Sequence, residues 1–170
     1  TFTGSKFALA VNNGTAALHS AYFSLGIGPG DEVIIPTYTW YAVATPLFSL
    51  GAKPVFAEID PETLLLDPDD VEKRITGQTK AVVVVHMWGN VCAMDKFLEL
   101  KKKYDIKIIE DASHAFGAKF KGQSVGSIGD IGCFSLQNSK AIAGGEAGVL
   151  VTDNQEIFDQ AILLGHPERG

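Results

Sequence analysis

The sequence lacks the positive charge and the long apolar runs that mark several classes of protein. Its 14 Lys and Arg residues are outnumbered by 20 Asp and Glu residues, for a net charge of −6. A nucleic-acid-binding protein needs a basic surplus to neutralise phosphates, so this balance disfavours that role. No run is long and apolar enough to span a bilayer, and no basic-then-apolar leader opens the chain. We therefore expect a soluble, cytoplasmic protein without a membrane segment.

Cysteine is also scarce. Cys92 and Cys133 are the two cysteines among 170 residues, too few for a zinc site or a disulfide framework. Both lie in apolar surroundings, which predicts buried free thiols and no metal site. Apolar residues make up 46% of the chain and charged residues 20%. That balance is typical of one folded domain with a substantial core.

Short apolar runs alternate with helix-like stretches along the chain. The run 82–85 consists of valines without polar alternation, which suits a strand covered on both faces. We expect strands over residues 7–11, 32–35, 54–58, 81–86, 106–110, 132–135 and 148–152. We expect helices over 15–25, from 67 onward, over 93–104 and over 155–164, and a small hairpin turn at 120–123. This alternation predicts an α/β fold, a three-layer sandwich with a mainly parallel central sheet.

A first candidate site lies where the first predicted strand meets the first predicted helix. Gly14 stands where the backbone must turn sharply, and Thr15 follows at the helix start. Free N–H groups and the helix dipole make such a junction a natural anion site, although an ordinary N-cap and turn is an equal alternative. The glycines of 26–30 follow a helix and include a proline, so we interpret them as a helix-ending turn.

Two further segments carry residues with chemical potential. Asp111 follows a strand at the edge where open α/β sheets bind ligands, and His114 comes just after it. Lys140 stands among small and polar residues ahead of a glycine run. Imine chemistry needs a neutral lysine amine, a state that burial or a neighbouring cation favours. Each residue also has a plainer explanation. Asp111 could cap the segment that follows it, His114 could be a satisfied polar side chain, and Lys140 could be an exposed loop lysine.

The order of the three segments matches one cofactor. Pyridoxal phosphate (PLP) needs an anion cradle, a carboxylate at its ring nitrogen and an amine for its aldehyde. The chain in fact resembles the large domain of the PLP-dependent sugar aminotransferases of the DegT/StrS family, within the aspartate-aminotransferase (type I) fold. The resemblance runs from about Gly4 to the end of the chain. It is carried by residues 13–18, 30–34, 39–40, 110–118 and 134–148.

The resemblance implies a role for each matching residue. Lys140 would form the Schiff base with the aldehyde and later carry a proton between the substrate carbon and the cofactor. Asp111 would pair with the ring nitrogen. His114, where many relatives have glutamine, would contact the 3-hydroxyl of the ring or stack near it. Trp40 would stack on the ring face, with a plain core tryptophan as the alternative.

The same resemblance implies that Gly14, Thr15 and Ser135 bind the cofactor phosphate. The implied reaction moves an amino group from glutamate or glutamine to a keto-sugar, expected to be nucleotide-linked, in a homodimer of the full-length protein. Residues 1–170 would form the PLP-binding large-domain core, without the N-terminal arm and the C-terminal small domain. We expect the isolated chain to be inactive. The alternatives are a PLP-dependent sugar dehydratase, whose relatives replace the lysine with histidine, and a non-catalytic cofactor-binding or regulatory fragment.

Overall fold

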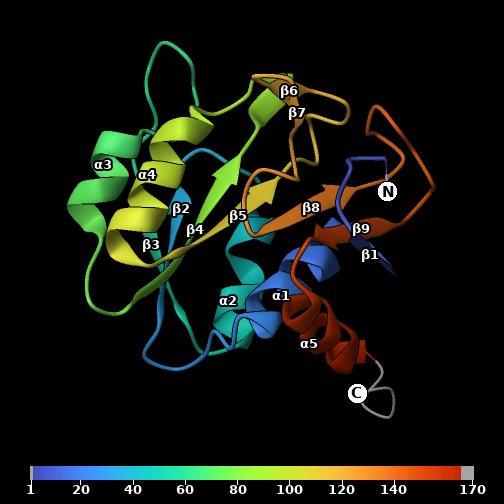
Figure 1. Ribbon diagram of the computed structural model, residues 1–170, viewed down its shortest axis with the longest axis horizontal. Helices are drawn as coiled ribbons and strands as arrows, with labels where there is room; N and C mark the ends of the chain where they lie inside the picture. The colour runs from blue at the N-terminus through green and yellow to red at the C-terminus, as the bar shows by residue number, and fades with distance from the viewer. Residues whose placement is uncertain (1, 166–170) are drawn as a thin grey trace.

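A seven-stranded sheet forms the centre of the computed structural model, which describes residues 2–165 (Figure 1). Its strands are β1 (Phe7–Val11), β2 (Glu32–Pro36), β3 (Lys53–Ala57), β4 (Thr79–Val85), β5 (Lys107–Asp111), β8 (Ile131–Ser135) and β9 (Gly148–Thr152). They lie in the order β1-β9-β8-β5-β4-β2-β3. All neighbours from β3 to β8 are parallel, whereas β9 pairs antiparallel with both β8 and β1. The mainly parallel sheet expected from the sequence is confirmed.

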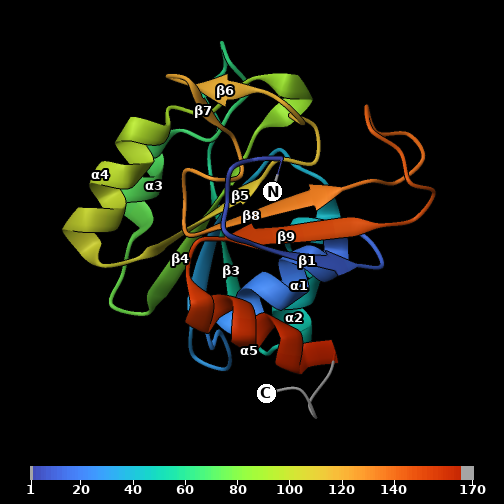
Figure 2. The same ribbon diagram turned by 45° about the vertical axis from the view of Figure 1, so that its right-hand side comes forward.

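Helices cover both faces of this sheet. They are α1 (Gly14–Ser24), α2 (Thr45–Ser49), α3 (Pro68–Arg74), α4 (Met94–Tyr104) and α5 (Gln155–Gly165). Helices α1, α2 and α5 lie together on one face, and α3 and α4 lie together on the other (Figure 2). The expected three-layer α/β sandwich is therefore confirmed. No helix within residues 2–165 is long and apolar enough to cross a membrane.

The boundaries of the predicted elements agree with the structure to within two residues. Helix α3 begins as expected, because the Asp67 side chain accepts the Asp69 N–H at 2.9 Å and Pro68 occupies the first turn. The hairpin of β6 (Lys119–Phe120) and β7 (Gln123–Ser124) is confirmed as well. The short helix α2 and the 3-10 turns η1 (Tyr41–Val43) and η2 (Met87–Gly89) were not predicted. Elements of so few residues show no hydrophobic periodicity that a sequence could reveal.

The parallel strands bring the candidate residues to one edge of the sheet. β4, β5 and β8 end at Val85, Asp111 and Ser135, and helix α1 begins beside them after β1. The valines of β4 are almost fully buried, at 0–7% exposure, as their unbroken apolar run predicted. A rigid strand covered on both faces therefore supports each of the polar residues at this edge.

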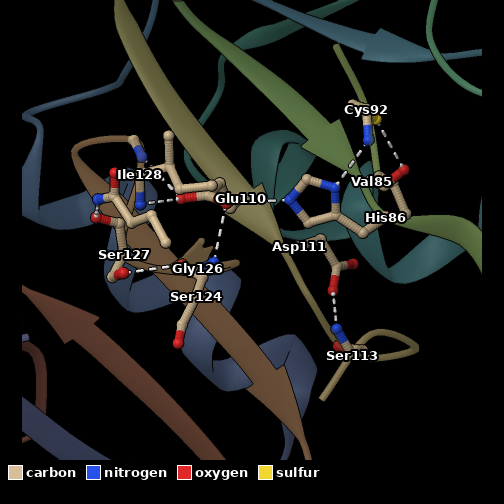
Figure 3. A network of polar contacts seen from close by, with 12 residues as sticks. Val85, His86, Cys92, Glu110, Asp111, Ser113, Ser124, Gly126, Ser127 and Ile128 are labelled. Carbon is tan, nitrogen blue, oxygen red and sulfur yellow. Dashed lines mark hydrogen bonds and ion pairs between the residues drawn. The ribbon is translucent and has the colours of Figure 1, made fainter. Parts of the chain in front are cut away.

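The fully buried carboxylate of Glu110 lies one residue before this edge (Figure 3). It accepts three backbone N–H groups, from Gly126 at 2.8 Å, Ile128 at 2.7 Å and Gly129 at 2.6 Å. Its Oε2 also lies 3.0 Å from His86 Nε2. These partners compensate a charge that would otherwise be strongly destabilising inside the protein.

His86 extends this network towards the site. Its Nδ1 accepts the Cys92 N–H at 3.2 Å, so the ring proton lies on Nε2 and is donated to Glu110. The backbone N–H of His86 donates to the Asp111 carbonyl at 3.0 Å. The segment after β4 is thereby held to the end of β5.

We expect Glu110→Gln to lower the free energy of unfolding by about 3 kcal/mol, because it turns an amide donor towards backbone donors and removes the charge that they stabilise. Chemical denaturation with a circular-dichroism readout measures the change. Glu99→Gln is the matched control, since Glu99 is an exposed carboxylate on α4. An unchanged denaturation midpoint for Glu110→Gln would contradict the role assigned to this carboxylate.

Both cysteines are buried and free, as predicted. Burial raises the pKa of Cys92 to about 12 and raises that of Cys133 well above its usual range. Because the thiolate is the reactive form, we expect neither thiol to react with a disulfide reagent at neutral pH while the chain is folded. In denaturant both should react within the mixing time. Fast labelling of the folded chain would show that one of the two sites opens to solvent.

Candidate active site

One pocket of about 890 Å³ opens at the carboxyl edge of the sheet. Every site residue predicted from the sequence lines it: Gly14, Thr15, Trp40, Asp111, His114, Ser135 and Lys140. These residues come from positions spread over most of the chain, and the fold brings all of them together. A second cavity of about 390 Å³ is lined by other residues, including Asp130 and Asn154.

The start of α1 forms one wall of the pocket. The Asn13 side chain accepts the Ala16 N–H at 2.8 Å, and the Asn13 carbonyl accepts the Ala17 N–H at 3.1 Å. Gly14 and Thr15 precede this first intrahelical bond, so their N–H groups have no partner within the helix. The two explanations of this segment therefore hold together: Asn13 caps the helix, and the next two amides remain for an anion. The sequence contained the cap signal in Asn13, but its role was not assigned.

Gly14 is required by a close approach between two backbones. A Cβ at this position would lie 2.7 Å from the Ser135 Cβ, a distance that atoms cannot tolerate without moving. The absence of a side chain lets the end of β8 pack directly on the helix start. The Ser135 hydroxyl and the amides of α1 therefore face the same part of the pocket.

Asp111 supplies the main buried acid of the pocket, at 7% exposure. Its Oδ1 accepts the Ser113 N–H at 3.0 Å, so the residue does cap the segment that follows β5. This is the only side-chain hydrogen bond to Asp111 within residues 2–165. Oδ2 thus remains available to a donor on a bound molecule.

Lys140 and His114 meet inside the pocket. Lys140 Nζ lies 2.8 Å from His114 Nε2, although the two residues are 26 positions apart. The imidazole also stacks on Trp88, with ring centroids 5.0 Å apart and planes inclined by 21°. Burial, and then the Lys140 charge, lower the pKa of His114 below its usual value, while Asp111 acts in the opposite direction. The His114 ring is therefore neutral at pH 7 and can accept a hydrogen bond from the amine.

The aromatic side chains around the pocket are exposed. Trp40 is 65% exposed and lies against Tyr41, with centroids 4.7 Å apart. This exposure contradicts the alternative of a plain core tryptophan. Trp88 is 69% exposed and was not singled out from the sequence. A single aromatic residue in an irregular segment gives no periodic signal, so its position could be learned only from the structure.

Comparisons with known proteins agree with this geometry. Residues 1–167 match the model of the DegT/DnrJ/EryC1/StrS aminotransferase family. The L-glutamine:2-deoxy-scyllo-inosose aminotransferase of Streptomyces kanamyceticus is 47% identical over an alignment that covers 92% of this chain and 40% of that protein. The GDP-perosamine synthase of Escherichia coli O157:H7 is 43% identical over 157 residues, which cover 92% of this chain and 43% of the relative.

A solved structure supports the same relationship. NtdA from Bacillus subtilis, with bound cofactor PMP, superposes with a TM-score of 0.88 at 31% identity, over 95% of this chain and 37% of that one. The chain thus spans less than half the length of the relatives that it matches. The matched family model, the sequence identity and the shared fold all point the same way: this chain belongs to the DegT/DnrJ/EryC1/StrS aminotransferase family.

Proposed function

We propose that this chain provides the cofactor site of a PLP-dependent aminotransferase that acts on keto-sugars. The observation that carries the proposal is the convergence of Lys140, Asp111 and the free amides of α1 on one pocket. A lysine alone, or a helix start alone, would have many explanations. An amine, a buried carboxylate and an anion cradle in one cavity match the three polar groups of PLP.

The polar groups that line the pocket fit the phosphate and the ring nitrogen of the cofactor. The Gly14 and Thr15 amides and the Ser135 hydroxyl would hold the phosphate, since the missing Cβ of Gly14 lets Ser135 lie directly beside the helix start. Asp111 would hold the ring nitrogen with the oxygen that Ser113 leaves unused. The PMP bound by NtdA, the amine form of the same cofactor, supports this choice. When bound, PLP supplies an aldehyde for an imine and a protonated ring that accepts electrons.

Each of the pocket residues would then have a separate role. Lys140 would bind the aldehyde carbon and, once released, carry a proton at its amine. The Asp111 carboxylate would keep the proton on the ring nitrogen by its negative charge. His114 would contact the 3-hydroxyl of the ring or stack near it, and Trp40 would cover the ring face and exclude water.

The substrates are proposed from the relatives. One relative is named for L-glutamine and an inosose, and another for GDP-perosamine. We propose glutamate or glutamine as the donor and a keto-sugar, nucleotide-linked, as the acceptor. A dehydratase is less well supported, because position 140 carries lysine. Product analysis with and without an amino donor separates the two reactions.

The organisation of the whole protein is part of the same proposal. Residues 1–170 would be the large-domain core of a longer chain, supported by their 40–43% coverage of the relatives. We propose that the full-length protein is a homodimer and works in the cytoplasm. The expected inactivity of the isolated chain stays a prediction, with the reason that water is not excluded from an open pocket.

We expect Lys140→Ala to abolish the visible absorbance band that PLP gives when it forms an imine with a lysine, because no other lysine lines the pocket within residues 2–165. The loss of the band is measured by titrating the full-length protein with PLP while recording the absorbance, and borohydride trapping then tests for the imine. Lys119→Ala, at an exposed position on β6, is the matched control and should keep the band. Persistence of the band and of turnover in Lys140→Ala would refute the proposed site.

We expect Gly14→Ala to weaken PLP binding about tenfold, because the added methyl pushes the helix start away from Ser135 and disturbs the phosphate cradle. The binding of pyridoxal, which has no phosphate, should change much less. Gly77→Ala is the control, since a Cβ there meets no atom. Equal losses for pyridoxal and PLP would place the damage outside the phosphate cradle.

A further inference from the structure

Trp88 has an unusual backbone for its side chain. It adopts φ 56° and ψ 23° in the turn η2, and Gly89 follows with φ 87°. A bulky residue in the left-handed region is strained, and such strain persists when the surroundings require it. Burial of the indole cannot be the reason, because 69% of the residue is exposed.

This backbone geometry brings the indole onto His114. The two rings are nearly parallel, at 21°, with centroids 5.0 Å apart. The turn starts directly after His86, which is held by Glu110 through its side chain and by the Asp111 carbonyl through its N–H. Trp88 is thus placed relative to the same strand end that carries Asp111.

His114 has few other restraints. Its Nε2 meets Lys140 Nζ at 2.8 Å, while its Nδ1 is buried and has no hydrogen-bond partner among the described residues. The lysine in turn lies in a loop whose residues 138, 139 and 141–146 are exposed. For Lys140, His114 is the only side-chain hydrogen-bond partner within residues 2–165. The amine therefore depends on the imidazole for its place in the pocket.

We propose that Trp88 is a positioning residue of the cofactor site: its indole fixes the plane of the His114 ring, and that ring holds the Lys140 amine ready for the aldehyde. The inference rests on the proposed function, since it concerns the same lysine. Trp88 acts through His114, which is why the arrangement needs an aromatic side chain at position 88 rather than a merely apolar one.

The charges around His114 agree with this arrangement. Lys140 and Asp111 are the charged groups that act on the ring, and the Trp88 indole stacked on it is uncharged. The lowered pKa of His114 keeps its ring neutral at neutral pH, so the ring can accept from the amine. Once acid protonates the ring, two cations face each other at contact distance and the pair separates.

The stack can be tested in the cofactor-free, full-length protein by tryptophan fluorescence. A protonated imidazole in contact with an indole quenches its emission. The emission of Trp88, obtained as the difference between the parent and Trp88→Phe, should rise with pH, with a midpoint below about 6.5. The same difference measured in a His114→Gln background should be independent of pH over this range. A titration that survives His114→Gln would overturn the proposed contact.

The effect on the lysine is tested by the rate at which the imine absorbance appears after PLP is mixed with the protein. We expect Trp88→Leu to slow this step several-fold at pH 7 and to change its pH profile, while Trp88→Phe restores both. Phe48→Leu is the matched control, an equally exposed aromatic outside the pocket. Unfolding temperatures show whether a variant is merely destabilised, in which case the pH profile would be unchanged.

The outcomes separate the two proposals. If Trp88→Leu keeps the rate and the pH profile of the parent, Trp88 does not position the amine. If the parent itself forms no imine band, the proposed cofactor site is wrong, whereas the fluorescence titration of the stack would remain. A band that forms in Lys140→Ala would likewise count against the cofactor lysine and not against the stack.

Discussion

The buried carboxylate of Glu110 is the constraint on which the site depends. A charge with no exposure to water is tolerated only when hydrogen bonds replace its hydration. Here the replacement comes from the amides of Gly126, Ile128 and Gly129 and from His86, which belong to segments far apart in the chain. Satisfying one carboxylate therefore fixes the loop before β8, the turn after β4 and the end of β5 relative to one another.

The neighbouring residue uses this rigidity for a different purpose. Successive side chains of a strand point to opposite faces, so Glu110 and Asp111 face opposite sides of the sheet. Glu110 is enclosed by its partners, whereas Asp111 faces the pocket with one oxygen that accepts no hydrogen bond from residues 2–165. The acid that is proposed to face the cofactor is thus supported by an acid that holds the backbone. The two adjacent carboxylates have separate functions because of the strand geometry.

The cation side of the pocket is built less rigidly. Lys140 lies in an exposed loop, and its amine is held through His114 and the ring of Trp88. In the role proposed for it, Lys140 binds and later releases an aldehyde, which needs a freedom to move that a fully packed lysine would lack. The contrast between a fixed carboxylate and a loosely held amine agrees with the roles proposed for them.

The sequence by itself determined the α/β class and the strand positions, and it indicated the candidate residues that line the pocket. Unbroken apolar runs such as 82–85 and cap residues such as Asp67 are local signals, and motif order together with the family resemblance made Lys140 and Asp111 candidates. Only the tertiary structure decided that β9 runs antiparallel, that Asn13 caps α1 by accepting the Ala16 N–H, and that Trp88 stacks on His114. These features depend on contacts between segments distant in the chain. Local propensity carries no information about such contacts, because their free energy arises only when the fold brings the partners together.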